Sequence, residues 1–203
     1  MKTIEILTYA RRCAAVSVAV LAAAASAQAD NVIVEWQRIV GIIETEVPVG
    51  RPSPGGAPCN ADIDCVLGSR APWVTTRGYA AVNLGSGQVH FQVKGLVVAG
   101  DPSFSNIGTT SAVKRVKGTL VCNDTAPGIP ELVDTPSVRL NELGNASFEG
   151  HVDLPYSCIA EPEDIVFLIR IAKMRVSPLI DTSTFRGFWI AAGMIRTIQG
   201  GGL

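Results

Sequence analysis

Two histidines, His90 and His151, are the residues of this chain best suited to metal chemistry. Asp153 follows His151 by two positions, which places both side chains on one face of an extended strand. Imidazole nitrogens and a carboxylate oxygen are ligands for copper and zinc. If the strands that carry His90 and His151 are neighbours, these three residues predict a metal site. Otherwise both histidines are solvated surface residues.

Carboxylates give two further candidate sites. Asp62 and Asp64 alternate between Cys59 and Cys65, as ligands do at the start of a calcium loop, but the glycine and the distal glutamate of that motif are missing. A polar surface loop explains the same residues. The second set, which a hydrolase would have to use, consists of Glu161, Glu163 and Asp164. No G-x-S-x-G, H-E-x-x-H or phosphate-loop motif is present, so a non-enzymatic protein is favoured.

Basic residues gather on two of the predicted strands. Lys94, Lys114, Arg115 and Lys117 would form a basic patch if their strands adjoin; a solvated charged face is the alternative. The whole chain carries a formal net charge of −1. A mildly acidic chain is a poor candidate for binding nucleic acid or an anionic membrane, because both reward a basic face. We therefore expect no nucleic-acid partner.

The cysteines predict two disulfide bonds. Cys13 lies in the N-terminal apolar run, and the other four are Cys59, Cys65, Cys122 and Cys158. An even number of cysteines in an exported chain favours disulfides, with three possible pairings. We favour Cys59–Cys65, which share one loop, and Cys122–Cys158, which would join the end of one strand to the approach of another. A four-cysteine zinc site is the alternative, but such sites use two closely spaced pairs.

The N-terminus has the pattern of a cleavable signal peptide over residues 1–29. A basic start with Lys2, Arg11 and Arg12 precedes the apolar run Cys13–Ala25 and the small-residue cleavage site Ala27-Gln28-Ala29. The run has 13 residues, too few to span a bilayer as a helix. Cleavage removes three positive charges and one negative charge, so the net charge becomes −3. We expect a periplasmic or extracellular protein without stable membrane insertion after cleavage.

The remaining sequence alternates apolar and polar residues, which is typical of strands with one buried face. Turn residues predict one hairpin from Tyr79–Leu84 and Gln88–Val98, and a second from Ser137–Leu140 and Ala146–Leu154. Ile165–Ile171 is apolar on both faces, as is Phe188–Ile195, which predicts central strands covered on both sides. The pattern predicts an all-β fold, an antiparallel β-sandwich of seven to nine strands with long loops. A closed β-barrel is the alternative.

Three segments resemble CHRD-like domains, which are extracellular β modules. They are ETEVPVG (Glu44–Gly50), VHFQVKGL (Val89–Leu96) and GFWIAAGMIR (Gly187–Arg196). The resemblance implies an extracellular β fold and no particular activity, because that family has no uniform one. The chain departs from the family pattern after Leu96, where no histidine-containing motif follows.

Residues 30–199 are therefore expected to form one β-sandwich domain, followed by a flexible tail over residues 200–203. We expect an exported, non-enzymatic protein that requires no cofactor and binds an unknown protein or glycan of the cell envelope. The long loops Gly100–Ala112 and Lys173–Thr184 are the expected binding surface, because recognition on rigid sheet scaffolds usually uses loops. A copper- or zinc-binding protein and a hydrolase are the alternatives.

Overall fold

The computed structural model describes residues 32–43, 48–50, 65–69, 71–100, 106–122, 130–174 and 187–200. Within these ranges the chain is nearly all strand, with one short helix, α2 (Tyr156–Ala160), and one 3₁₀ turn, η2 (Pro162–Asp164). The strands are β1 (Ile33–Gly41), β2 (Pro48–Gly50), β3 (Cys65–Leu67), β4 (Trp73–Val74), β5 (Arg77–Asn83), β6 (Gln88–Lys94), β7 (Val97–Val98), β8 (Val113–Cys122), β9 (Glu131–Asp134), β10 (Val138–Arg139), β11 (Ala146–His151), β12 (Val166–Met174) and β13 (Trp189–Gln199).

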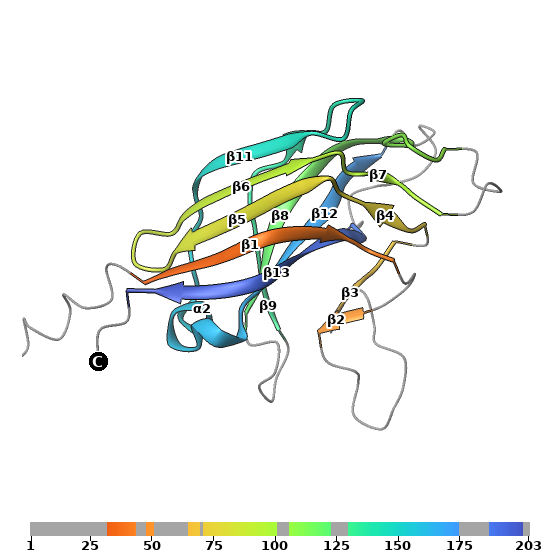
Figure 1. Ribbon diagram of the computed structural model, residues 1–203. Helices are drawn as coiled ribbons and strands as arrows, with labels where there is room; N and C mark the ends of the chain where they lie inside the picture. The colour runs from red at the N-terminus through yellow and green to blue at the C-terminus, as the bar shows by residue number, and fades with distance from the viewer. Residues whose placement is uncertain are drawn as a thin grey trace, which may run out of the picture.

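One antiparallel sheet holds most of these strands, in the order β10-β8-β12-β13-β1-β5-β6-β11, with β9 paired to β8. The sheet curls so that β8 and β12 pass behind the layer formed by β11, β6, β5, β1 and β13 (Figure 1). This confirms the predicted all-β antiparallel fold, and a single curled sheet supplies both layers. The described strands do not close a barrel, because β10 and β11 are unpaired edges. Short ladders β2-β3 and β4-β7 complete the fold.

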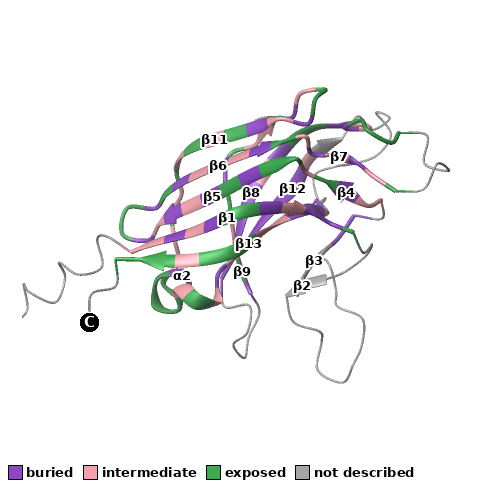
Figure 2. Cartoon of the chain, viewed as in Figure 1, coloured by how far each residue is buried: buried purple, intermediate pink, exposed green. Residues whose placement is uncertain are grey.

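The core lies between the two layers and is centred on three aromatic rings. The ring of Phe167 on β12 lies 5.5 Å from that of Trp36 on β1 and 5.7 Å from that of Phe91 on β6. A Cβ atom at Gly118 would lie 3.0 Å from ring atoms of both phenylalanines, so a glycine on β8 allows the rings to meet. The predicted alternation is confirmed, because β6 buries every second residue and β1 buries Val34 and Trp36 before two exposed residues, at 37 and 38, shift its pattern (Figure 2).

The first predicted hairpin is confirmed. Strands β5 and β6 pair antiparallel from Arg77↔Lys94 to Val82↔Val89. At the turn, Asn83 Oδ1 accepts hydrogen bonds from the backbone N–H groups of Gly85 and Ser86, both at 3.0 Å. The hairpin register fixes which side chains lie opposite each other on its outer face.

The second predicted hairpin is wrong. Strand β10 pairs with β8, and β11 pairs with β6, so the two predicted partners lie at opposite edges of the curled sheet. The turn between them is attached to the end of β6 instead, because Leu96 N donates to Gly144 O at 2.9 Å and Gly95 N donates to Asn145 Oδ1 at 3.1 Å. Gly144 has φ 73°, and a Cβ there would lie 2.5 Å from the Leu96 backbone. These contacts keep β11 on β6.

The prediction of two covered central strands is confirmed for β12 and only half correct for β13. Residues 165–171 are buried except for the partly buried Val166, whereas β13 is buried from Trp189 to Ala191 and then exposes Met194 (51%) and Ile195 (61%) (Figure 2). The reason is the pairing: β12 contacts β13 only over 168–170, so the rest of β13 pairs with β1 alone.

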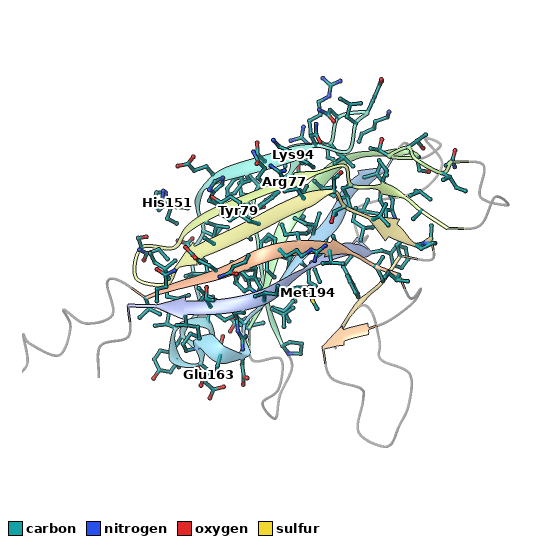
Figure 3. All side chains as sticks on the ribbon, viewed as in Figure 1. Arg77, Tyr79, Lys94, His151, Glu163 and Met194 are labelled. Atoms are coloured by element: carbon teal, nitrogen blue, oxygen red, sulfur yellow. A yellow bond between two sulfur atoms is a disulfide. The ribbon has the colours of Figure 1, made fainter. Side chains whose placement is uncertain are left out.

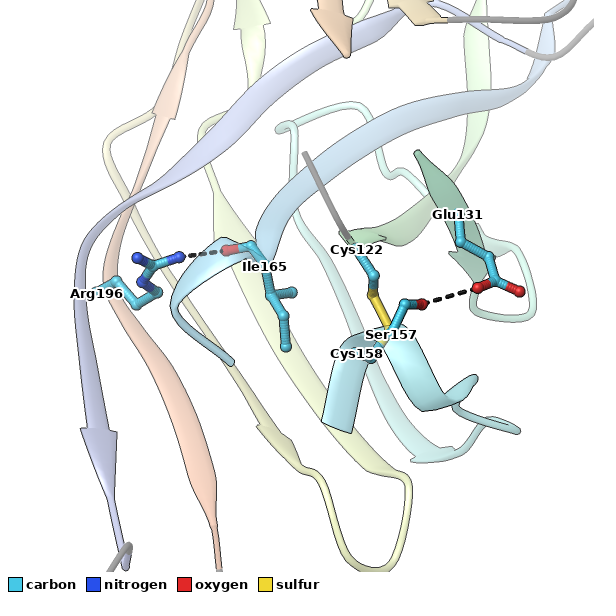
Figure 4. The surroundings of a disulfide bond; sticks show 6 residues. All are labelled: Cys122, Glu131, Ser157, Cys158, Ile165 and Arg196. Atoms are coloured by element: carbon cyan, nitrogen blue, oxygen red, sulfur yellow. Dashed lines mark hydrogen bonds between the residues drawn. A yellow bond between two sulfur atoms is a disulfide. The ribbon is translucent and has the colours of Figure 1, made fainter. Parts of the chain in front are cut away.

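The disulfide Cys122–Cys158 joins the end of β8 to α2, with 5.0 Å between the Cα atoms, and confirms that predicted pair (Figure 4). Nearby, Ser157 Oγ donates to Glu131 Oε2 at 2.7 Å, so the α2 segment is attached to β9 as well. Cys59 lies outside the described residues, so its pairing with Cys65 stays a prediction. Across the described ranges, no helix is long and apolar enough to cross a membrane.

Candidate functional site

A groove of about 390 Å³ opens where the two edge strands diverge from the turn at 141–145. This basic groove is walled by β10 on one side and by the end of β6 and the start of β11 on the other. Its volume lies within the range of small-ligand sites. The residues that line it are Gln92, Val93, Lys94, Val138, Arg139, Asn141, Asn145, Ala146 and Ser147.

Two cross-strand pairs of like charge each contribute one residue, Lys94 or Arg139, to the lining of the basic groove. Arg77 lies directly opposite Lys94 in the β5–β6 ladder, and Arg139 lies directly opposite Arg115 in the β10–β8 ladder. Figure 3 shows Arg77 and Lys94 close together at the same end of the molecule. Like charges directly opposite one another destabilise a sheet by roughly 0.2–1 kcal/mol. The two like-charge pairs are therefore expected to lower the free energy of unfolding slightly.

Among the described residues, no carboxylate forms an ion pair with Arg77, Lys94 or Arg139. The ion pairs found among the described residues join Asp134 to Lys117 and to Arg170, on the outer face of β8 and β12. Arg77, Lys94 and Arg139 are exposed and form no ion pair within that part of the chain. The groove therefore presents positive charge to solvent.

Hydrogen-bond donors line the groove between the cations. Asn141 Oδ1 accepts from the backbone N–H groups of Leu143 (3.0 Å) and Asn145 (2.9 Å), and Asn145 Oδ1 accepts from Gly95 N (3.1 Å). Because the oxygen of each amide is occupied by backbone, the NH₂ group of each is left to donate. Such a donor-rich wall suits an acceptor-rich ligand.

Tyr79 lies beside the basic groove, opposite Gln92 in the β5–β6 ladder. Its hydroxyl is hydrogen-bonded to His90 Nδ1, and its ring lies edge-on to the imidazole, with 4.8 Å between centroids and 85° between planes. Burial raises the pKa of Tyr79 above 10.0, and the nearby carboxylates of Glu149 and Glu35 raise this pKa further. The phenol is therefore neutral at physiological pH.

The predicted metal residues are only partly brought together. Strands β6 and β11 are neighbours, with His90 opposite Glu149 and His151 opposite Gln88, whereas Asp153 lies beyond the end of β11. Within the described residues, no group of three or more His, Cys, Asp or Glu side chains is placed to hold a metal ion. The metal site stays a prediction for which the structure supplies no ligand cluster.

His151 and Asp153 line a second hollow, of about 610 Å³, between β9 and the segment that follows β11. Its two other acidic residues already have partners: Glu131 accepts from Ser157, and Asp134 accepts from Thr119 Oγ1 at 2.6 Å besides its ion pairs. The predicted hydrolase set at η2 lies at the opposite end of the molecule from the basic groove, as the position of Glu163 shows (Figure 3).

The predicted basic patch is assembled in part. Lys94 lines the groove, and Arg115 lies beside it with its Nε donating to Ser137 Oγ at 2.9 Å. Lys114 is exposed on β8. Lys117 does not add to the patch, because it forms an ion pair with Asp134.

The sequence interpretation missed Arg77 and Arg139. The register of the first hairpin would have placed Arg77 opposite Lys94, whereas no local pattern places Arg139. Asp62 and Asp64 lie outside the described residues, as do residues 101–105 and 175–184 of the predicted binding loops.

Comparisons with known proteins give no family for this chain. No family model, no curated protein and no solved structure matches it. The likeness to CHRD-like domains therefore remains an expectation from sequence, and any function has to be argued from the groove itself.

Proposed function

We propose that this chain is an exported, non-enzymatic binding module that holds an anionic ligand in the basic groove. The observation that carries the proposal is that one hollow is lined by Lys94 and Arg139, each of which has a second cation, Arg77 or Arg115, directly opposite it in its ladder. An anion placed there relieves the repulsion within both pairs. Binding therefore recovers stability that the free protein lacks.

The chemistry of the cations limits the ligand. An arginine guanidinium binds a carboxylate, sulfate or phosphate group with two parallel hydrogen bonds, and the lysine adds a point charge. Each exposed contact contributes only about 0.2–1 kcal/mol, so a ligand with a single charge would bind weakly. A ligand that repeats its anionic group along a chain makes several contacts at once, and such a polyanion is the expected partner.

The composition of the groove favours binding over catalysis. The residues that line it are aliphatic, amide, hydroxyl or cationic, and they include neither a histidine nor a carboxylate to transfer a proton. The donors are arranged to hold an acceptor-rich ligand without changing it.

The test is the affinity of the purified chain for two polyanions, oligogalacturonate and dextran sulfate, with neutral dextran for comparison. We expect both polyanions to bind and dextran not to bind, and the affinity to fall as salt screens the exposed charges. Arg77→Gln, Lys94→Gln and Arg139→Gln should each weaken binding by about two- to fivefold.

Arg38→Gln is the matched control, because Arg38 is exposed on β1 of the same sheet and does not line the groove. Equal weakening by Arg38→Gln would mean that overall charge, not the groove, attracts the ligand. Failure of both polyanions to bind at low salt would overturn the proposal.

A further inference from the structure

Tyr79 presents an aromatic surface at the edge of the basic groove. The side chain is 39% exposed and lies two positions after Arg77, so both side chains are on the outer face of β5. Figure 3 shows Arg77, Tyr79 and Lys94 grouped on the same part of the sheet. A ligand that contacts Arg77 and Lys94 therefore lies next to this ring.

The ring of Tyr79 is held in one orientation before any ligand arrives. Its hydroxyl is hydrogen-bonded to His90 Nδ1, and the edge-to-face contact with the imidazole fixes the plane of the phenol. A side chain that is already ordered loses little conformational entropy when it binds, which is why rigid tyrosines are effective contact residues. An exposed but immobilised aromatic ring is thus suited to packing against a flat partner.

The carboxylates of Glu149 and Glu35 lie near the ring of Tyr79, so no anionic group of a ligand is placed on that side. The uncharged neighbours of Tyr79 indicate what the partner is. Gln92 lies directly opposite Tyr79, and Ser147 lies directly opposite Gln92 on the next strand, so an amide and a hydroxyl continue the row across the sheet. A sugar ring carries hydroxyl groups around its edge and C–H bonds on its faces. The hydroxyl groups can form hydrogen bonds with the polar row. The C–H bonds carry partial positive charge and pack favourably on the negative face of an aromatic ring.

We infer that the ligand of the basic groove is an anionic glycan, with one sugar ring packed on Tyr79 and its carboxylate or sulfate groups at Arg77, Lys94 and Arg139. This inference rests on the proposed function and adds the chemical class of the ligand. A polyanion without sugar rings, such as an acidic polypeptide, would form ion pairs with the cations but would not pack on Tyr79 or bind the polar row beside it.

The test compares two carboxylate polymers of matched length, oligogalacturonate and poly-L-glutamate, on the full purified chain. We expect tighter binding of oligogalacturonate. Tyr79→Ala should weaken oligogalacturonate binding by about two- to tenfold, the range of an aromatic packing contact, and leave poly-L-glutamate binding unchanged. Tyr79→Phe keeps the ring and should retain most of the glycan affinity.

Tyr156→Ala is the matched control, because Tyr156 is 82% exposed on α2, remote from the groove, and should affect neither polymer. Equal weakening of both polymers by Tyr79→Ala, or no effect on either, would overturn the inference. If Tyr79→Ala fails to fold, Tyr79→Leu replaces it as the variant without a ring.

The proposed function and this inference fail in different ways. If the variants of Arg77, Lys94 and Arg139 weaken both polymers while Tyr79→Ala weakens neither, the groove binds anions without recognising sugars. If those charge variants have no effect on either polymer, the proposed function itself is wrong.

Discussion

Arg170 and Asp134 form an ion pair between β12 and β9, with 3.2 Å from Nη1 to Oδ1. The arginine side chain is 1% exposed and the aspartate side chain is 37% exposed. Loss of one partner of a buried pair costs about 3–5 kcal/mol, because the remaining charge stays buried. Since Asp134 is partly solvated and Arg170 also donates to Gly187 O, we expect Asp134→Ala to lower the free energy of unfolding by about 3 kcal/mol.

Urea unfolding of the variant measures this effect. Lys117→Gln removes the second, more exposed cationic partner of Asp134 and should lower the free energy of unfolding by less than about 1 kcal/mol. Equal losses in the two variants would show that the burial of Arg170 does not decide the cost.

The parts of the fold that depend on local sequence could be predicted. Period-two alternation located β1 and β6, which bury one face, and a continuous apolar run located β12, which buries both faces. The first hairpin could be predicted because its turn residues and its two strands are contiguous. The choice between a two-layer fold and a closed barrel could not be predicted, because it depends on how far one sheet curls.

The second hairpin shows why turn residues alone are insufficient. Glycine and asparagine at Gly144 and Asn145 did indicate a turn, but both use backbone contacts with the end of β6 that no local pattern contains. The basic groove exists only because of that non-local attachment. Lys94 could therefore be named from the sequence, whereas the hollow beside it and Arg139 could not.

Gly144 is expected to be intolerant of any side chain. Its φ is 73°, and an added Cβ would lie 2.5 Å from both the N and O atoms of Leu96. Gly144→Ala combines an unfavourable backbone conformation, about 1 kcal/mol, with a backbone clash, so it should lower the free energy of unfolding by about 2 kcal/mol or more. The variant should also weaken ligand binding, because the turn forms one end of the basic groove.

Gly108→Ala separates the two causes, since Gly108 has φ 74° and nothing within 4 Å of the added Cβ. This control should lose only the conformational part, about 1 kcal/mol. Similar losses at both glycines, measured by urea unfolding, would show that the contact with Leu96 is not what requires a glycine at 144.

Tyr79 should ionise only at alkaline pH above the usual range. Burial and then the carboxylates of Glu149 and Glu35 raise its pKa above 10.0 in the folded protein. A raised folded-state pKa means that the related stability is complete below about pH 10 and is lost as pH rises through the folded value. The difference in phenolate absorbance between the wild-type chain and Tyr79→Phe isolates this group. A midpoint at or below 10.0 would contradict the environment described for the ring.

The like-charge pair Arg77↔Lys94 predicts a conflict between stability and binding. Arg77→Glu replaces repulsion across the β5–β6 ladder with attraction, so the free energy of unfolding should rise by about 0.5–1 kcal/mol at low salt and by less at high salt. The same change places a negative charge beside the basic groove and should weaken oligogalacturonate binding more than Arg77→Gln does.

Arg77→Gln removes the repulsion without adding attraction, so its stability should fall between those of the wild-type chain and Arg77→Glu. Such an ordering, opposite for stability and for affinity, is expected where a protein keeps an unfavourable arrangement for its function. Thermal unfolding and binding measured on the same three proteins check it. If Arg77→Glu is both less stable and equally able to bind, the pair is an ordinary solvated edge of the sheet and the cations have no common ligand.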